Sequence, residues 1–107
     1  MSTIYLIESI RDYDTVYKIG YTKATNAKNR LIQLQTGNDG NLKIINEYRT
    51  NYKTKLETSL KNLYKHKNIK NEWFALDISD IADFEKTCER LEKGFDALRE
   101  NPFFNIT

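Results

Sequence analysis

Two short segments near the N-terminus constrain the fold most, because both are rich in β-branched and aromatic residues. Residues 3–9 read Thr-Ile-Tyr-Leu-Ile-Glu-Ser, and residues 15–20 read Thr-Val-Tyr-Lys-Ile-Gly. The polar residues 11–14 between them are typical of a turn. The pattern predicts a β-hairpin with a loop of about four to six residues.

Beyond this hairpin, helical and strand-like patterns alternate along the chain. Apolar residues spaced three and four apart predict helices, and β-branched or aromatic runs predict strands. In chain order we expect a helix from Thr25 or Asn26 to about Gln35, a strand over 42–50, a helix over about 53–65, a loop over 65–71 and a short strand over 72–76.

A sustained apolar stripe predicts a last helix from about residue 80 to 100, with Asp80 as its N-terminal cap. We expect the helix to end by Asn101-Pro102, because the residue before proline avoids helical geometry. We expect Phe103 and Phe104 then to fold back onto the core. The stripe completes the core or, alternatively, forms a dimer interface. Its residues recur at spacings of 3, 4, 3, 4 and 3: Ile81, Phe84, Cys88, Leu91, Phe95 and Leu98.

This order of elements predicts an α+β fold: a small three-stranded, at least partly antiparallel sheet flanked by helices, plus a C-terminal helix. The length of 107 residues suits one domain, with a core over 3–77. The sequence contains no apolar run long enough for a membrane span and no signal-peptide pattern. A single Cys88 and a single His66 exclude a Cys/His zinc site within one chain. We expect an intracellular protein that does not contact membranes, and we favour a monomer.

Charge is segregated along the chain. Residues 1–76 hold 13 Lys and Arg against 7 Asp and Glu, a net charge of +6, whereas residues 77–107 carry a net charge of −4. A basic body suits a partner that bears phosphates, although chance segregation on solvated faces is the alternative. Five basic residues are expected to contact the nucleic-acid backbone: Arg49, Lys53, Lys61, Lys65 and Lys67.

Ile4-Tyr5 and Lys18-Ile19-Gly20 resemble the two halves of the motif that names the GIY-YIG nuclease superfamily. Arg30 and Glu57 follow in the order of that family. The phrases Tyr-Lys-Ile-Gly-Tyr-Thr and Asn-Glu-Trp-Phe are similar to the branch found in phages, eukaryotic DNA viruses and some fungal proteins. This resemblance covers roughly residues 3–77. It implies an endonuclease that hydrolyses DNA phosphodiester bonds with Mg²⁺ or Mn²⁺.

The resemblance also implies a catalytic role for four residues. Tyr5 is expected to act as the general base, and Lys18 as a cation that lowers the pKa of this phenol and orients the nucleophile. Arg30 is expected to hold the scissile phosphate, and Glu57 to bind the metal ion. Each residue has a structural alternative: a core aromatic, a solvent-facing strand lysine, a helix-flank arginine and a surface salt bridge to a lysine, respectively.

Two departures from the superfamily pattern favour a second hypothesis. Thr3 stands where the first half-motif has glycine, and Leu34 stands where a histidine or tyrosine often follows the arginine. A catalytically inactive nucleic-acid-binding module of the same fold is therefore the alternative function, and a protein-interaction domain using the acidic last helix is a third. Gly20 is expected to allow close approach of a backbone or phosphate, or to be a simple turn glycine. Glu72 is a further candidate for the metal site.

Overall fold

The structure is a computed structural model that describes residues 1–37 and 40–100. The described residues form one antiparallel sheet in the order β3-β1-β2-β5-β4. Its strands are β1 (Ser2–Ile10), β2 (Thr15–Thr22), β3 (Asn41–Thr50), β4 (Asn68–Lys70) and β5 (Trp73–Phe74). The helices are α1 (Lys28–Thr36), α2 (Lys53–Leu63), α3 (Ile78–Ala82) and α4 (Phe84–Glu100), with a 3₁₀ turn at Lys65–Lys67.

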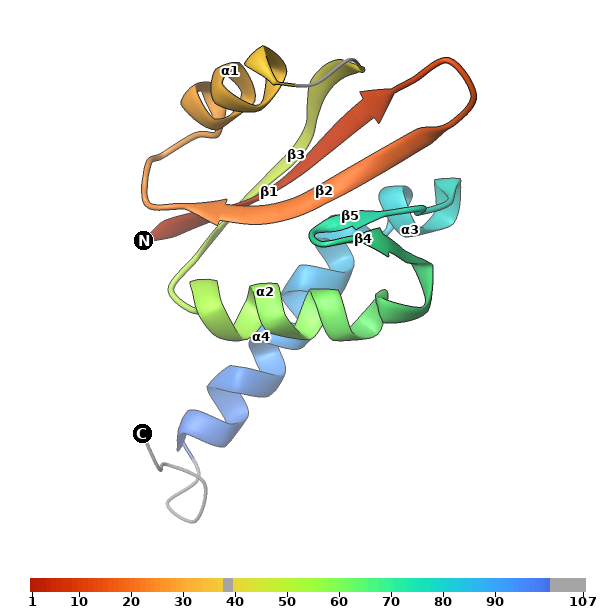
Figure 1. Cartoon of the computed structure of the whole chain (residues 1–107). Coiled ribbons are helices and arrows are strands. Elements are labelled where there is room, and N and C mark those ends of the chain that lie inside the picture. The colour runs from red at the N-terminus through yellow and green to blue at the C-terminus, as the bar shows by residue number, and fades with distance from the viewer. Residues whose placement is uncertain (38–39, 101–107) are drawn as a thin grey trace.

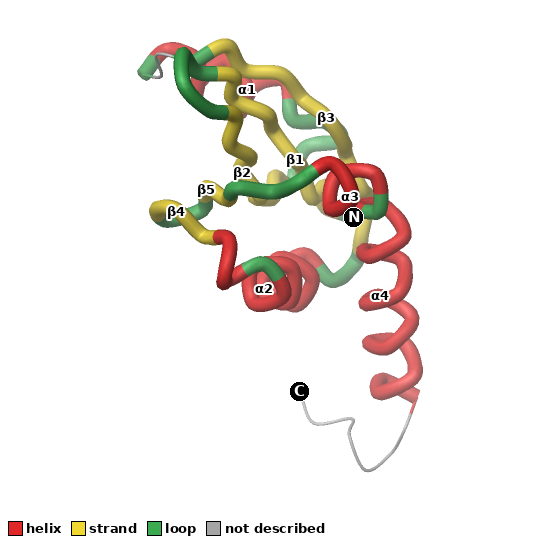
Figure 2. Tube along the Cα trace, turned by 90° about the vertical axis from the view of Figure 1, so that its right-hand side faces the viewer, coloured by secondary structure: helices red, strands yellow, loops and turns green. Residues whose placement is uncertain are grey.

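Helices cover both faces of the sheet. Figure 1 shows α1 on one face and α2 with α4 on the other, and Figure 2 shows the same layers from the side. The predicted α+β fold is therefore confirmed. The sheet has five strands among the described residues rather than the three predicted. β5 lies within the short strand expected over residues 72–76, whereas β4 has three residues and lies in the stretch expected to be a loop, because it is too short to produce a periodic pattern.

β1 lies between β2 and β3 in the sheet and pairs with both of them. Its four residues from Ile4 to Ile7 are all buried, at most 4% exposed. Ile4 and Leu6 join the core under α2 and α4, whereas Tyr5 and Ile7 join the smaller core under α1. A strand with helices on both faces therefore explains the uninterrupted apolar run.

β2 follows the expected alternation. Tyr17 and Ile19 point into the core shared with α2 and α4, which leaves Lys18 on the α1 side of the sheet. The turn at 11–14 is closed by a hydrogen bond from the Arg11 amide to the Asp14 carbonyl at 2.9 Å. The strand runs on to Thr22, so Gly20 lies inside it and is not a turn glycine.

The predicted last helix is interrupted. Asp77, not Asp80, is the N-cap: its side chain accepts a hydrogen bond from the Asp80 amide, and the Asp80 side chain bonds back to the Asp77 amide. This capping box begins α3 at Ile78, two residues earlier than predicted. The chain then leaves helical geometry at Asp83 and begins α4 at Phe84.

The apolar stripe of the last helix packs mainly against the core. Phe84 and Cys88 are completely buried, and Ile81, Leu91 and Phe95 pack against them, whereas Leu98 is exposed. Burial raises the pKa of the Cys88 thiol to about 12, so this group is an inert core side chain. The predicted contact of Phe103 and Phe104 and the helix end at Asn101 lie outside the described residues.

Candidate active site

A cleft of about 330 Å³ lies beside β2, where the edge of this strand continues beyond its short pairing with β5. It collects side chains from β1, β2, α1 and α2, and from the turn between β4 and β5. All four residues expected to be catalytic are present in its wall. The lining residues are Tyr5, Lys18, Gly20, Tyr21, Arg30, Gln33, Leu34, Glu57 and Glu72.

Tyr5 and Gly20 face each other across the β1–β2 pair. The Tyr5 ring crosses over Gly20 so closely that a Cβ built there would clash with Oη and lie 2.5 Å from Cζ. Glycine is therefore required at this position for the Tyr5 phenol to lie in the cleft. Gly20 was expected to allow a backbone or a phosphate to approach closely. In the structure it is the Tyr5 side chain that approaches Gly20.

Tyr5 is a buried phenol, only 4% exposed, that forms part of the cleft wall. Burial is the main cause that raises its pKa above the usual 10, and the negative charges of Glu72 and Glu57 act in the same direction. The positive charges of Arg30 and Lys61 act against this rise. At neutral pH the Tyr5 hydroxyl therefore carries its proton. It acts as a base only when further positive charge approaches it.

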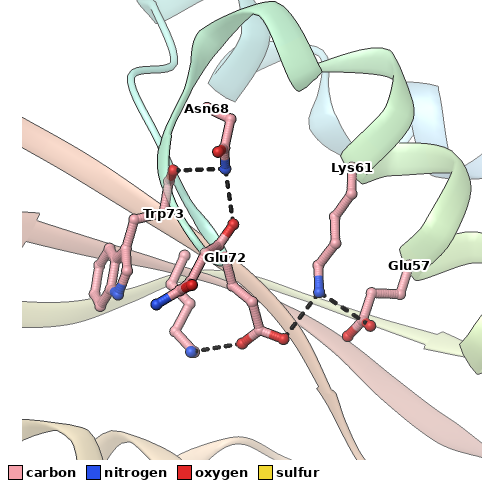
Figure 3. A network of polar contacts seen from close by, with 7 residues as sticks. Glu57, Lys61, Asn68, Glu72 and Trp73 are labelled. Atoms are coloured by element: carbon pink, nitrogen blue, oxygen red, sulfur yellow. Dashed lines mark hydrogen bonds and ion pairs between the residues drawn. The ribbon is translucent and has the colours of Figure 1, made fainter.

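A polar network joins four side chains at the cleft, and all of them except Lys61 belong to its lining. Lys18 Nζ lies 2.7 Å from Glu72 Oε2, and Lys61 Nζ lies 2.9 Å from Glu72 Oε1. The same Lys61 ammonium lies 3.1 Å from Glu57 Oε1. Figure 3 shows Lys61 between the two carboxylates. Two ammonium groups and two carboxylates thus alternate, and their charges cancel.

Glu72, which the sequence offered only as a further candidate for the metal site, lines the cleft together with the four expected residues. The turn before β5 holds it: Asn71 adopts a positive φ of 52°, and Asn68 Nδ2 donates to the carbonyls of Asn71 at 2.7 Å and Trp73 at 3.2 Å. The Glu72 carbonyl accepts a hydrogen bond from the Ile19 amide at 3.2 Å. These bonds fix the Glu72 carboxylate beside β2. The signal in the sequence was its place directly before the apolar pair of β5.

The network shifts the pKa values of two of its members, Glu72 and Lys61. Partial burial opposes ionisation of Glu72, but hydrogen bonds from Lys18 and Lys61 outweigh it and lower the Glu72 pKa below 4.5. Partial burial likewise opposes the charge of Lys61, yet hydrogen bonds to Glu72 and Glu57 raise the Lys61 pKa above 10.5. With these shifts, the Glu72 carboxylate and the Lys61 ammonium both carry their charge at neutral pH.

Arg30 reaches the cleft from α1, on the opposite side from the network. Leu31 and Leu34 pack α1 against the sheet. The side chain of Glu47, on β3, accepts a hydrogen bond from the Ala27 amide at 2.7 Å, at the N-terminus of α1. A carboxylate there is favourable for the helix dipole. The sequence predicted a cap from Thr25 or Asn26; the N-cap position is Ala27, and the Asn26 side chain accepts a hydrogen bond from the Lys28 amide at 3.1 Å.

Thr3 ties the segment before α1 to β1. Its hydroxyl contacts the Ala24 carbonyl at 2.9 Å and the Thr25 carbonyl at 3.2 Å, and the residue is completely buried. Thr3 stands where the resemblance noted in the sequence would place the glycine of the first half-motif. In this chain the replacement fixes the loop that leads to Arg30.

The five residues expected to contact nucleic acid are dispersed. Lys61 lies in the polar network, and Lys53 lies 5.5 Å from the ring centre of Tyr21 at the cleft rim. Arg49 lies on β3, opposite Thr3 of β1. Lys65 is exposed beyond the end of α2, and Lys67 forms ion pairs with Asp77 and Asp80.

The cleft contains two carboxylates that suit a hard divalent cation. Mg²⁺ binds through one or two carboxylates, with water and substrate phosphate as its other ligands, and Glu57 and Glu72 supply such oxygens. Residues 1–37 and 40–100 contain no group of three or more His, Cys, Asp or Glu placed to hold a metal ion. The donor set therefore fits an open Mg²⁺ site that is completed by substrate, and not a closed protein cage.

Comparison with protein families identifies the chain. The family model of the T5orf172 domain matches residues 2–92, and the chain belongs to this family. No curated protein and no solved structure matches it. Among the described residues, no helix is long and apolar enough to cross a membrane.

Proposed function

We propose that this chain is a divalent-metal-dependent endonuclease of the GIY-YIG type, which hydrolyses phosphodiester bonds in DNA. One observation carries the proposal: Tyr5, Lys18, Arg30 and Glu57 come from four different elements and line one cleft. The T5orf172 domain is related to homing and GIY-YIG-like nucleases, which supports the same class. The proposal treats residues 1–107 as a single nuclease domain.

Arg30 and Lys18 are the cations that would receive the phosphate. The exposed guanidinium of Arg30 can bind two phosphate oxygens at once, and the charge that develops in the transition state strengthens this contact. Lys18 is held by Glu72 and lies 5.7 Å from the ring centre of Trp73, so its ammonium is fixed before substrate arrives. Such preorganisation lowers the reorganisation needed during reaction.

Tyr5 would orient the attacking water. Its phenol enters the cleft over Gly20 and keeps its proton at neutral pH in the free protein. Deprotonation needs added positive charge near the phenol, because burial and Glu72 oppose it. Glu57 would hold Mg²⁺ or Mn²⁺, which supplies Lewis-acid stabilisation of the phosphate charge.

An inactive nucleic-acid-binding module is the second candidate. Two observations favour it: the Tyr5 pKa is raised and not lowered, and the Glu57 carboxylate is already paired with Lys61. This candidate expects DNA binding that weakens with salt, with no cleavage and no effect of Tyr5→Phe on binding.

Supercoiled plasmid distinguishes the two candidates. The purified protein is incubated with plasmid over a range of divalent metals, beside Glu57→Ala and the control Cys88→Ala, which changes a buried core residue outside the cleft. Nicking by the wild type and by Cys88→Ala, lost in Glu57→Ala, supports the nuclease. No nicking in any metal, with salt-sensitive binding retained, supports the inactive module.

A further inference from the structure

Lys61 occupies the space between the two acids of the candidate metal site. Its ammonium is 3.1 Å from a Glu57 oxygen and 2.9 Å from a Glu72 oxygen, and its side chain is 26% exposed. Glu57 is more enclosed, at 16% exposed. A cation of the protein itself is thus already bound at the carboxylate that would receive the divalent ion.

The two carboxylates differ in what remains if Lys61 leaves. Glu72 keeps a second ammonium partner, Lys18, at 2.7 Å. Glu57 is joined to the network through Lys61. Departure of Lys61 therefore exposes negative charge mainly on Glu57, the acid that the proposed function assigns to the metal.

Electrostatics opposes simultaneous binding. A divalent ion on Glu57 would lie within a few ångströms of the Lys61 ammonium, and like charges at that separation repel, most strongly where solvent is partly excluded. Because Lys61 has a flexible side chain, the pair can open without movement of α2. The released ammonium is then available to a substrate phosphate in the same cleft.

We propose that Lys61 is an internal competitor of the divalent cation: it neutralises Glu57 in the free protein and gives up this carboxylate when the metal binds. The inference rests on the proposed function, since it takes Glu57 as the metal ligand. In this proposal Lys61 controls how tightly the metal ion binds. This role differs from the permanent contact with a nucleic-acid phosphate that the sequence suggested. By linkage, any phosphate that draws Lys61 away strengthens metal binding.

The test measures Mn²⁺ affinity without DNA, by calorimetry and by the electron paramagnetic resonance of free Mn²⁺. The proteins are the wild type, Lys61→Met, Lys55→Met and Glu57→Gln. Lys55 is an exposed lysine of the same helix, so its variant removes the same charge away from the network. Lys61→Met should bind Mn²⁺ roughly three- to tenfold more tightly than wild type, whereas Lys55→Met should change affinity by less than about twofold.

Every outcome decides one of the two claims. If Lys61→Met binds Mn²⁺ as tightly as Lys55→Met or more weakly, the proposed competition is wrong. If Glu57→Gln has lost Mn²⁺ binding in the same experiment, Glu57 is still the metal ligand. Wild-type affinity in Glu57→Gln, or no binding by any protein, overturns the metal role of Glu57 and the competition with it. Thermal melting verifies that each variant is folded, and Lys61→Gln replaces Lys61→Met if the latter does not fold.

Discussion

The contact of Tyr5 with Gly20 shows how one residue without a side chain determines the position of another. Gly20 lies in regular strand β2, so its conformation does not demand glycine; the Tyr5 ring above it does. Tyr5 and Gly20 belong to the two halves of the motif noted in the sequence, but nothing in the sequence indicated that they are in direct contact. The register Tyr5↔Gly20 depends on pairing between two strands, which a local pattern does not reveal.

Gly20→Ala should therefore displace the Tyr5 phenol from the cleft. A methyl group placed against a buried ring lowers the free energy of unfolding by about 1–3 kcal/mol, and we expect plasmid nicking to fall at least tenfold. Urea unfolding and a nicking assay measure both effects.

Gly94→Ala is the matched control for this change. A Cβ at Gly94 meets no atom within 4 Å, and the residue lies on the exposed face of α4. The substitution should raise stability by up to about 1 kcal/mol, because glycine weakens a helix interior. If Gly20→Ala matches Gly94→Ala in stability and activity, the packing argument for Gly20 is wrong.

Glu72 gives a pH-dependent contribution to stability. Its pKa is lowered in the folded state, so the contribution is present above the unfolded value of 4.5 and is lost as pH falls through the folded value. Wild type should be more stable than Glu72→Gln near pH 7, and the difference should shrink below about pH 4. Thermal melts across pH measure it, with exposed Glu89→Gln as control. A pH-independent difference would contradict the ion-pair account.

Among the secondary-structure elements, helix α1 determines the position of Arg30. α1 is held by Glu47 at its N-terminus and by the Thr3 contacts to the preceding loop. The apolar face of α1 was predictable from the sequence. The hydrogen bonds of Glu47 and Thr3 that hold this helix were not. These bonds join residues about twenty positions apart, so only the folded arrangement brings them together.

Thr3→Val should loosen this attachment while preserving side-chain volume. Two carbonyl oxygens lose a buried hydroxyl, which lowers the free energy of unfolding by about 1–3 kcal/mol, and cleavage should weaken as Arg30 loses its position. Urea unfolding and single-turnover cleavage measure the two effects. Thr15→Val, on the exposed end of β2, should change both little. Equal effects of the two variants would sink the positioning role of Thr3.

Long periodic elements and the short strand β5 were predictable, whereas β4 and the break between α3 and α4 were not. The strands β1, β2 and β3 and the helices α1 and α2 begin within about three residues of the predicted positions. β4 was predicted as loop, because its three residues are exposed and carry no apolar signal. The break at Asp83 was missed because the apolar stripe continues across it from Ile81 to Phe84. The gathering of Tyr5, Lys18, Arg30 and Glu57 in one cleft followed from the family resemblance, whereas the Lys61 bridge did not.

At the scale of the whole molecule, basic residues differ in how free they are to meet DNA. Lys65 is exposed, whereas Lys67 is engaged by Asp77 and Asp80 at the start of α3. Lys65→Met should therefore weaken DNA binding severalfold and reduce its salt dependence, because a phosphate contact is lost. Lys67→Met should mainly lower the melting temperature.

Fluorescence anisotropy of a labelled duplex at several salt concentrations compares the two variants, and thermal melts complete the comparison. A larger affinity loss in Lys67→Met than in Lys65→Met would contradict the assignment of Lys67 to the folded framework. The net charge of +6 over residues 1–76 makes binding to DNA the expected default in low salt.

The central claim is that residues from separate elements act as one catalytic site. Single-turnover nicking of supercoiled plasmid with Mg²⁺ tests it most directly, using wild type, Arg30→Ala, Glu57→Ala and the double variant. Residues that act as a unit are not additive, so each single variant should reduce the rate by at least about a hundredfold and the double variant should be no slower than the slower single one. No nicking by wild type, or wild-type rates in both single variants, would contradict the account.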